Sequence, residues 1–435
     1  MGFAVQVVAA VAAVALVSSG SVAAIASWQV LQSAQPTVSL AMPGGHGTAA
    51  PVPRLTAQSG EVNMLLVATD TRDGQGAGFD DPANRRASSG VGNNDTNLLV
   101  HISADHTNMA VVSFPRDLIV PIPACTNAAG AVTPASSAAM LNTALARGGE
   151  RHGLACVAST IGGLTGLQID YAGKITFDGV VKLADAVGGV EVCLATPIVD
   201  DDVTPALDLQ AGTRTLSGAE AAAFLRSRHG VGDASDLGRI SNQQTFMSAL
   251  ARQTVSAGTL TNPAKVLRLA DTAFRNMTLS DTLSDPGTLA RIALAVNTVG
   301  LSNMVFVQYP VVDDPDAPGR VIVAEGVAAT LNRVLQANEP VVLGADSLGR
   351  SAVRDPSAPP SKPTAPSRPS TPSQPSTPSQ QETSSAPAAS QPAAPPAPAS
   401  PAVPSSAVTP SPTPTQLPDI VSGQSADTVT CAAKR

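Results

Sequence analysis

The sequence predicts an α/β domain, and three stretches carry that prediction. Residues Glu61–Ala68 read EVNMLLVA, a continuous apolar run with the length of a buried strand. Residues Asn97–Ser103 and Met109–Phe114 form two strand-like runs around a short polar segment, which indicates a hairpin. A strand, a helix and a second strand are then expected within residues 171–194, so strands and helices share one domain.

The other elements follow along the chain. Ala138–Arg147 and a segment beginning at Cys156 are expected to be helical. A helix ending near Arg228 precedes a loop and a long helix, whose predicted N-cap is Asp236. Two more helices, ending near residues 274 and 300, two strands over residues 304–309 and 321–324, and a helix over residues 326–337 close the domain.

Composition and charge exclude some classes of function. The chain has 435 residues, of which 43% are hydrophobic, so it can bury a sizeable core. Its net charge of −7 and the absence of a basic run with interleaved aromatic residues argue against a nucleic-acid partner. The four cysteines do not have metal-ligand spacing.

In an oxidising compartment, Cys125 and Cys156 are the natural disulfide pair, closing a loop of about 30 residues worth about 3 kcal/mol. Cys431 either pairs with Cys193 or stays free.

The N-terminal stretch predicts a membrane anchor. Residues 1–53 contain no Asp, Glu, Lys or Arg, and Phe3–Trp28 is almost wholly apolar, which is long enough for a transmembrane helix. An export signal cleaved near Ala24-Ile25-Ala26 is the alternative, although the basic segment typical of such signals is missing. We expect a retained span over residues 1–28 and an extracytoplasmic tether over residues 29–58. Both alternatives place the rest of the chain outside the cytoplasm.

The globular domain is expected over residues 59–343. Residues 344–418 are rich in Pro, Ala and Ser and predict a disordered linker that cannot bury a core. Residues 419–435 form a short C-terminal tail, for which disorder is the expected state.

Charged residues follow the predicted strands. Asp70 and Arg72 come directly after the first strand. Asp95 precedes one strand of the hairpin and Arg116 follows the other, so the two should lie at the same edge of the sheet. A structural ion pair between Asp95 and Arg116 is an alternative to a catalytic role.

A second charged cluster surrounds the start of the long helix. Arg226 and Arg228 precede it, Arg239 lies in its first turn, and Gln243 lies one turn later on the same face. A cation at a helix N-terminus opposes the helix dipole, which costs about 0.3–1 kcal/mol. Local stability therefore does not explain Arg239, whereas a bound anion would. We accordingly expect Arg239→Ala to abolish activity without unfolding the domain.

Five motifs together resemble a known family. They are Asp70-Thr71-Arg72, Asn94-Asp95-Thr96, Ser113-Phe114-Pro115-Arg116-Asp117, Phe224-Leu225-Arg226-Ser227-Arg228, and Asp236-Leu237-Gly238-Arg239 with Gln243-Gln244. Their order and spacing over Glu61–Gln253 resemble the LytR-CpsA-Psr family of cell-envelope glycopolymer phosphotransferases, with an actinobacterial style of composition. The sequence departs from the pattern at Asn242, where many members carry a further arginine.

The resemblance implies an α/β/α sandwich with a central mixed β-sheet and a hydrophobic lipid pocket, preceded by one transmembrane helix. It implies an Mg²⁺-dependent enzyme on the outer face of the cell membrane, which moves a glycopolymer phosphate from a polyprenyl pyrophosphate carrier to peptidoglycan. Teichoic acids, capsules and arabinogalactan are attached in this way by members of the family.

Phosphoryl transfer needs charge neutralisation and in-line positioning, which suits this residue set. The pyrophosphate-binding candidates are Arg72, Arg116, Arg226, Arg228, Arg239 and Gln243. The catalytic candidates are Asp70, Asp95, Arg116 and Arg239, and the Mg²⁺ ligands are expected to be Asp95 and Asp236.

Two other functions fit the same residues. One is a polyprenyl pyrophosphate phosphatase, which would use water as the acceptor. The other is a non-catalytic envelope protein that binds lipid-linked glycan. The acceptor distinguishes the phosphotransferase from the phosphatase. A label on the substrate reaches peptidoglycan in the first case and is released into solution in the second.

Overall fold

The structure is a computed structural model that describes residues 38, 40, 58–69, 71, 91–127, 129–256, 263–344, 346–357 and 415–434. The predicted membrane span over residues 1–28 lies outside this range, as do Asp70 and Arg72. No helix among the described residues has the length and apolar character needed to cross a membrane. The boundary of the anchor stays a prediction, whereas the linker predicted over residues 344–418 begins too early, because residues 352–354 form strand β17 (Ala352–Arg354).

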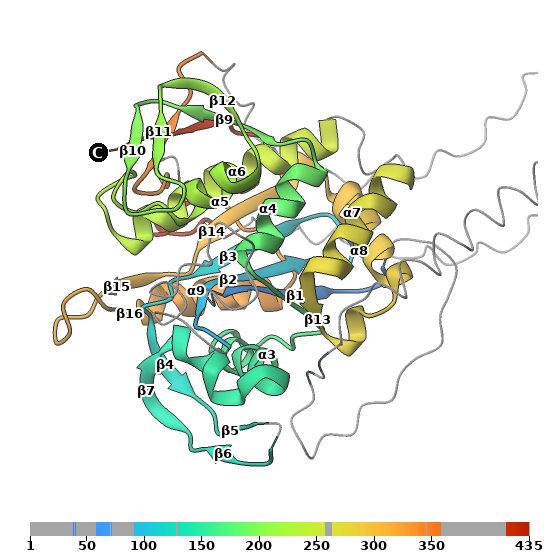
Figure 1. Cartoon of the computed structure of the whole chain (residues 1–435). Helices are drawn as coiled ribbons and strands as arrows, with labels where there is room; N and C mark the ends of the chain where they lie inside the picture. Colours follow the sequence, from blue (N-terminus) through green and yellow to red (C-terminus); the bar gives the residue numbers. More distant parts are fainter. Residues whose placement is uncertain are drawn as a thin grey trace, which may run out of the picture. The chain divides into compact units, whose positions relative to one another are not determined.

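A seven-stranded mixed sheet forms the centre of the fold (Figure 1). Strand β1 pairs in parallel with β8 and antiparallel with β2, while β3 pairs antiparallel with β2 and in parallel with β14. The spatial order is β13 (Met277–Leu279), β8 (Tyr171–Ile175), β1 (Val62–Thr69), β2 (Asn94–Ile102), β3 (Met109–Phe114), β14 (Met304–Gln308) and β18 (Gly423–Ser425).

The predicted hairpin is confirmed as β2 and β3. Asn97 pairs with Phe114, so Asp95 and Arg116 both extend from the same edge of the sheet. The alternation of side chains along each strand then sends Leu99 to one face of the sheet and Leu98 to the other.

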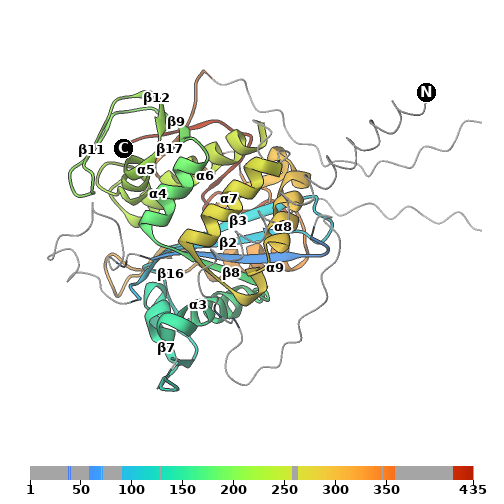
Figure 2. The same cartoon turned by 45° about the vertical axis from the view of Figure 1, so that its right-hand side comes forward.

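Helices cover both faces of the sheet, as Figures 1 and 2 show. On one face, Leu65, Val67 and Leu99 share a core with residues of α3 (Ala144–Thr165) and α9 (Glu325–Gln336). The other face is covered by α4 (Phe177–Ala186), α5 (Gly218–Arg226), α6 (Asp236–Ser256), α7 (Pro263–Asn276) and α8 (Pro286–Val299). The predicted mixed sheet between helices is therefore confirmed.

A smaller four-stranded sheet lies beside α5 and α6. Its order is β12 (Gly212–Leu216), β9 (Val190–Leu194), β19 (Thr430–Ala432) and β17 (Ala352–Arg354). The two-stranded pairs are β10 (Ile198–Asp200) with β11 (Leu207–Leu209), β4 (Ile119–Ile122) with β7 (Ser136–Met140), β5 (Cys125–Thr126) with β6 (Val132–Thr133), and β15 (Val311–Asp313) with β16 (Val321–Val323).

The C-terminal tail is not disordered, so that expectation was wrong. Residues 415–434 supply β18 to the edge of the main sheet and β19 to the interior of the smaller sheet. The domain also extends past residue 343 to include β17. The tail folds because two distant parts of the chain, β14 and β9, offer strand edges that local sequence does not reveal.

The helix expected over Ala138–Arg147 begins later than predicted, because only residues 144–147 of that range belong to an α-helix, α3. Residues Ser136–Met140 form strand β7, because pairing with β4 overrides the helical propensity of alanine. Helix α3 starts later and continues past a kink at Gly149, which adopts a positive φ of 68°.

Both pairs of cysteines form disulfides. The predicted pair Cys125–Cys156 is present, and Cys193 is bonded to Cys431. The second bond connects residues 238 positions apart and joins β9 to β19. All four cysteines of the chain are therefore oxidised.

Candidate functional site

Helix α6 presents the first charged residues of the site. Ser235 caps the helix, because its Oγ accepts a hydrogen bond from Gly238 N at 3.1 Å and its carbonyl accepts one from Arg239 N at 3.2 Å. Asp236 is thus the first helical residue and not the N-cap, which corrects the prediction by one position. This frees the Asp236 carboxylate to face its neighbours.

Arg239 has a counter-charge within its own helix. Its Nη2 lies 2.7 Å from Asp236 Oδ1 and donates to the carbonyl oxygen of Asp95 at 2.8 Å. The residue is only 4% exposed. Asp236 compensates for the unfavourable dipole, so the inference that only a bound anion explains Arg239 was too strong.

Arg116 connects the sheet edge to the helix. Its Nη1 lies 2.9 Å from both oxygens of Asp95, and its Nε lies 3.7 Å from carboxylate oxygens of Asp117 and Asp236. Burial alone would lower the pKa of the Arg116 guanidinium, but the three carboxylates outweigh burial and raise that pKa. The ion pair between Asp95 and Arg116, which was the alternative to a catalytic role, is therefore present, and it belongs to a larger cluster.

Arg228 completes the cluster at Asp236. Its Nη2 lies 3.2 Å from Asp236 Oδ1. Burial lowers the pKa of the Arg228 guanidinium, and the nearby charges of Arg239 and Arg116 lower it further. An arginine crowded by two others and still charged favours an added anion.

Asp117 and Arg320 extend the cluster on its outer side. Arg320 Nη1 lies 3.2 Å from Asp117 Oδ1. Leu118, the residue after Asp117, forms a β-bridge with Val321, the first residue of β16. The ion pairs now join four arginines to three aspartates, so the cluster carries more positive than negative charge. Sequence reasoning missed Arg320, because it lies 203 residues after Asp117 and has no local motif.

The two predicted Mg²⁺ ligands differ in availability. The Asp236 side-chain oxygens are buried and accept no hydrogen bond of ordinary geometry from the described part of the chain. Both oxygens of Asp95 accept hydrogen bonds from Arg116. A buried carboxylate without a hydrogen bond suits a hard cation, so Asp236 fits Mg²⁺ provided that the guanidinium groups 2.7–3.7 Å from its Oδ1 turn away, whereas Asp95 would have to exchange its hydrogen bonds from Arg116 for the ion.

The other predicted site residues are placed as follows. Gln243 Nε2 donates to Leu225 O at 3.0 Å and to Thr96 Oγ1 at 3.4 Å, so it braces α5 and β2 against α6. Arg226 is the last residue of α5 and is half-buried. Asn242, at the position where the sequence departs from the family pattern, is fully buried and donates to Phe224 O at 2.8 Å.

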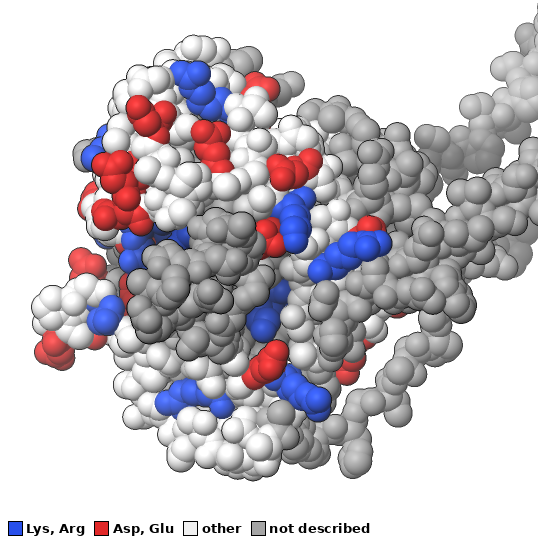
Figure 3. Space-filling view, in the orientation of Figure 1, with Lys and Arg blue, Asp and Glu red and all other residues white. Residues whose placement is uncertain are grey.

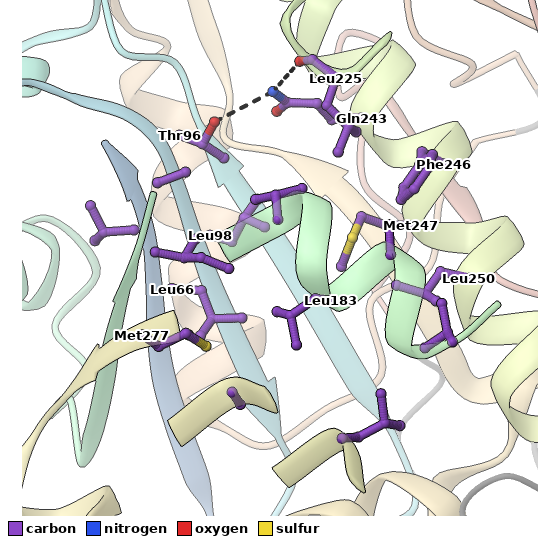
Figure 4. Close-up of a pocket in the computed structure, with 18 of the residues that line it drawn as sticks. Leu66, Thr96, Leu98, Leu183, Leu225, Gln243, Phe246, Met247, Leu250 and Met277 are labelled. Atoms are coloured by element: carbon purple, nitrogen blue, oxygen red, sulfur yellow. Dashed lines mark hydrogen bonds between the residues drawn. The ribbon is translucent and has the colours of Figure 1, made fainter. Parts of the chain in front are cut away.

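An apolar cavity of about 430 Å³ lies between the sheet and the helices α4, α6 and α7 (Figure 4). Its lining includes Leu66, Leu98, Leu183, Phe246, Met247, Leu250 and Met277. Arg239, Gln243 and Thr96 also line it. Figure 4 shows Gln243 and Thr96 together at one end of the cavity. The cavity thus joins an apolar interior to a polar end that shares Arg239 with the charged cluster.

Asp200 fixes the loop that carries Arg228, although no local motif predicts this role. It is buried, and its Oδ2 accepts from Ser227 Oγ at 2.6 Å and from Gly230 N at 3.2 Å. Burial would raise the pKa of the Asp200 carboxyl, but these hydrogen bonds outweigh burial and lower that pKa. Asp200 therefore stabilises the loop in its ionised form.

Asp200→Asn should lower the free energy of unfolding by about 1–3 kcal/mol at neutral pH. A carboxyl with a depressed folded pKa contributes stability above its unfolded pKa and loses it as pH falls through the folded value. The difference between wild type and variant should therefore shrink below about pH 4. Thermal unfolding across this range is the measurement, with the exposed Asp202→Asn as control. A difference that does not depend on pH would contradict this role.

The neighbouring surface carries acidic side chains. Figure 3 shows them gathered over the lobe that contains β10 and β11, where Asp201, Asp202 and Asp208 are exposed. Asp202 Oδ2 lies 2.8 Å from His229 Nδ1, but both side chains are more than half exposed. Such a pair contributes little in water, so the buried cluster at Asp95, Arg116 and Asp236 remains the candidate site.

Several known proteins are similar to this chain. The cell wall biosynthesis protein LcpA of Corynebacterium glutamicum is 31% identical over 273 residues, which cover 59% of this chain and 51% of that protein. The probable cell wall biosynthesis protein LcpB of the same organism is 31% identical over 240 residues, or 55% and 53%. The chain thus matches about half the length of these curated relatives.

The polyisoprenyl-teichoic acid–peptidoglycan teichoic acid transferase TagT of Bacillus subtilis is 25% identical over 285 residues, which cover 65% of this chain and 79% of that protein. Among solved structures, a Streptococcus agalactiae protein has a TM-score of 0.51 at 20% identity and covers 64% of this chain and 88% of its own. That likeness shows a shared fold.

The sequence model described as the LytR_cpsA_psr family matches residues 30–336, which is most of the chain. This match spans every strand of the mixed sheet except β18, the apolar cavity, and every arginine and aspartate of the charged cluster. The chain therefore belongs to the LytR-CpsA-Psr family.

Proposed function

We propose that this domain transfers a glycopolymer phosphate from a polyprenyl pyrophosphate carrier to a hydroxyl group of peptidoglycan. One observation carries the proposal: the apolar cavity ends at Arg239, which also belongs to the arginine–aspartate cluster. A prenyl chain would lie in the cavity and its pyrophosphate at the cluster. Ligand sites of this kind combine apolar walls with a few convergent polar groups.

The relatives support the same chemistry. TagT of Bacillus subtilis and TagU of Oceanobacillus iheyensis are named polyisoprenyl-teichoic acid–peptidoglycan teichoic acid transferases. The corynebacterial relatives are named cell wall biosynthesis proteins. The actinobacterial style of the sequence makes an arabinogalactan-type polymer our proposed transferred glycopolymer.

The proposed reaction exchanges one phosphorus–oxygen bond for another. The acceptor hydroxyl oxygen bonds to the phosphorus that carries the glycan, and the bond from that phosphorus to the bridging oxygen breaks. Polyprenyl phosphate leaves with the electron pair, and the hydroxyl proton passes to a carboxylate. Asp95 is our candidate for that carboxylate, because a phosphate that attracts Arg116 would free the Asp95 oxygens.

The arginines would hold the pyrophosphate and neutralise its charge as the bond breaks. Arg116, Arg228 and Arg239 approach Asp236 from three sides and can turn their remaining N–H groups toward an anion. Asp236 is our candidate ligand for Mg²⁺, and Asp95 would be the second ligand where it does not hold the hydroxyl proton. A bound Mg²⁺ would supply charge neutralisation at the phosphate oxygens.

We also propose that the domain works outside the cytoplasm, held at the cell membrane by an N-terminal helix over residues 1–28. The pairing of all four cysteines supports an oxidising compartment, because disulfides rarely persist in the cytosol.

Transfer of label tests the proposal. The purified full chain is incubated with Mg²⁺, peptidoglycan and a polyprenyl pyrophosphate glycan labelled in its sugar. Label bound covalently to peptidoglycan supports the transferase. Soluble labelled sugar phosphate without transfer would establish a phosphatase instead. Binding of the labelled lipid without turnover would establish a non-catalytic protein.

Filling the cavity should separate lipid binding from phosphate binding. Leu183→Trp places a larger side chain in the cavity and should weaken binding of a polyprenyl phosphate by about tenfold or more, the equivalent of 1.4 kcal/mol. Binding of inorganic pyrophosphate should change less than about twofold, because the charged cluster is intact. Calorimetry of both ligands is the measurement.

Leu294→Trp is the matched control, because Leu294 is an exposed leucine that does not line the cavity. The control should bind both ligands as the wild type does. Equal lipid affinity in Leu183→Trp and wild type would place the prenyl chain elsewhere.

A further inference from the structure

Helix α6 has two faces with different partners. Gln243, Phe246, Met247 and Leu250 lie on the face that lines the cavity, in line with Arg239. The other face contacts Ser351 at the start of the helix and residues 424–428, near the C-terminus of the chain, from Gln244 to Arg252. The position of the cavity wall and of Arg239 is therefore coupled to that C-terminal part.

Gln424 makes the central contact. Its Nε2 donates to Gln244 O at 3.0 Å and to Ser248 Oγ at 2.6 Å, and its Oε1 accepts from Thr430 Oγ1 at 2.9 Å. Gln424 is 4% exposed, and Ser248 is fully buried. A buried amide whose donors and acceptor are all satisfied fixes the helix in one register, since any shift would leave polar atoms unpaired.

Further contacts hold the last turns of the helix. Arg252 Nη1 donates to Ala426 O at 3.0 Å and to Thr428 O at 2.9 Å. Burial lowers the pKa of the Arg252 guanidinium, while Asp427 opposes that effect.

The start of the helix is held as well. Ser351 Oγ donates to Gly238 O at 2.8 Å, and Ser351 N donates to Ser241 Oγ at 3.1 Å. Ser351 in turn accepts a backbone hydrogen bond from Ala433, whose carbonyl accepts one from Gly232 at 2.9 Å. The first turn of α6, which carries Asp236 and Arg239, is thus joined to the C-terminus through Ser351.

The C-terminal segment is itself anchored in three ways. Strand β18 pairs with β14, β19 lies between β9 and β17, and the disulfide Cys193–Cys431 connects the segment to β9. The covalent bond matters because residues 358–414 separate this segment from the preceding described residue in the chain. With the bond in place, the segment stays at α6 whatever the length of that connection.

We propose that residues 415–434 act as a positioning element for the site, with Gln424 as the positioning residue and Cys193–Cys431 as the covalent bond that keeps the segment on α6. The segment sets the place of Arg239 and of the cavity wall. Its effect on transfer rests on the proposed function, whereas its effect on α6 does not.

Hydrogen exchange of the full chain tests the effect on α6. Gln424→Glu replaces the donor with an oxygen that faces the Gln244 carbonyl, so residues 236–248 should exchange about tenfold faster. Strands β1 and β2 should exchange as in the wild type. Gln416→Glu is the matched control, because Gln416 is an exposed glutamine of the same segment. Equal exchange rates in α6 for Gln424→Glu and Gln416→Glu would overturn the proposal.

A second variant covers the case in which Gln424→Glu does not fold. Cys193→Ser combined with Cys431→Ser removes the disulfide and leaves the side chain of Gln424 unchanged. Relative to the wild type, this double variant should raise the exchange rate in α6 more than the exchange rate in β1. Unchanged exchange in this double variant would also count against the covalent anchor.

Transfer kinetics supply the functional readout. At a temperature well below unfolding, Gln424→Glu should lower kcat by about tenfold while KM for the acceptor stays within about twofold, because Arg239 and not the acceptor site is displaced. Faster exchange in α6 of Gln424→Glu together with a wild-type kcat would exclude a role of residues 415–434 in the transfer reaction. If instead the wild-type chain transferred no label to peptidoglycan, the proposed function would fail while the exchange result would stand.

Discussion

Arg116→Ala should lower the rate of glycopolymer transfer by about 10²–10³-fold. Arg116 is the side chain that contacts both Asp95 and Asp236, so its loss removes a phosphate-binding cation and leaves two carboxylates facing the substrate. The remaining charges would repel the pyrophosphate. Turnover of a polyprenyl pyrophosphate glycan with peptidoglycan is the measurement.

Arg214→Ala is the control, because Arg214 is exposed on β12 and donates only to nearby backbone carbonyls among the described residues. It should leave transfer and melting temperature unchanged. An Arg116→Ala variant that transfers within about twofold of wild type would show that the cluster is structural.

Arg239→Ala should abolish transfer and also destabilise the fold by about 3 kcal/mol. The side chains of Arg239 and Asp236 are 5% and 9% exposed, so the substitution leaves a buried carboxylate with fewer counter-charges. Arg228 stays 3.2 Å from Asp236 and limits the loss of stability. The expected loss therefore lies at the lower end of the range for broken buried ion pairs. The sequence alone had predicted that this substitution abolishes activity without unfolding the domain.

A double variant separates the two effects. Asp236→Ala combined with Arg239→Ala removes both charges of the pair, so it should recover part of the stability but none of the activity. Denaturant unfolding and transfer assays on the two single variants and the double variant are the measurements. Stability equal to wild type in Arg239→Ala would contradict the structural half of this account, and transfer by the double variant would contradict the catalytic half.

The parts of the fold that could be predicted are those with a local pattern. The apolar run at β1 and the two runs of the hairpin predicted their strands, and antiparallel pairing then placed Asp95 beside Arg116. The start of α6 was predicted to within one residue, because Ser235 and Asp236 are both good capping residues.

The remaining parts depend on contacts between distant residues. Gly423–Ser425 and Thr430–Ala432 contain small and polar residues without a strand pattern, and they form strands only because β14 and β9 offer free edges. Arg320 reaches Asp117 from a hairpin far along the chain. The counter-charge of Arg239 was visible three residues earlier, but Asp236 had been interpreted as the helix N-cap and as a metal ligand.

The most direct test of the central claim is a crystal structure of the protein with a polyprenyl pyrophosphate bound. We expect the prenyl chain in the cavity beside Leu66, Leu183 and Met247, with phosphate oxygens within hydrogen-bond distance of Arg116 and Arg239. A prenyl chain bound outside the cavity, with Arg116 still paired to Asp95 and no phosphate beside it, would contradict the account.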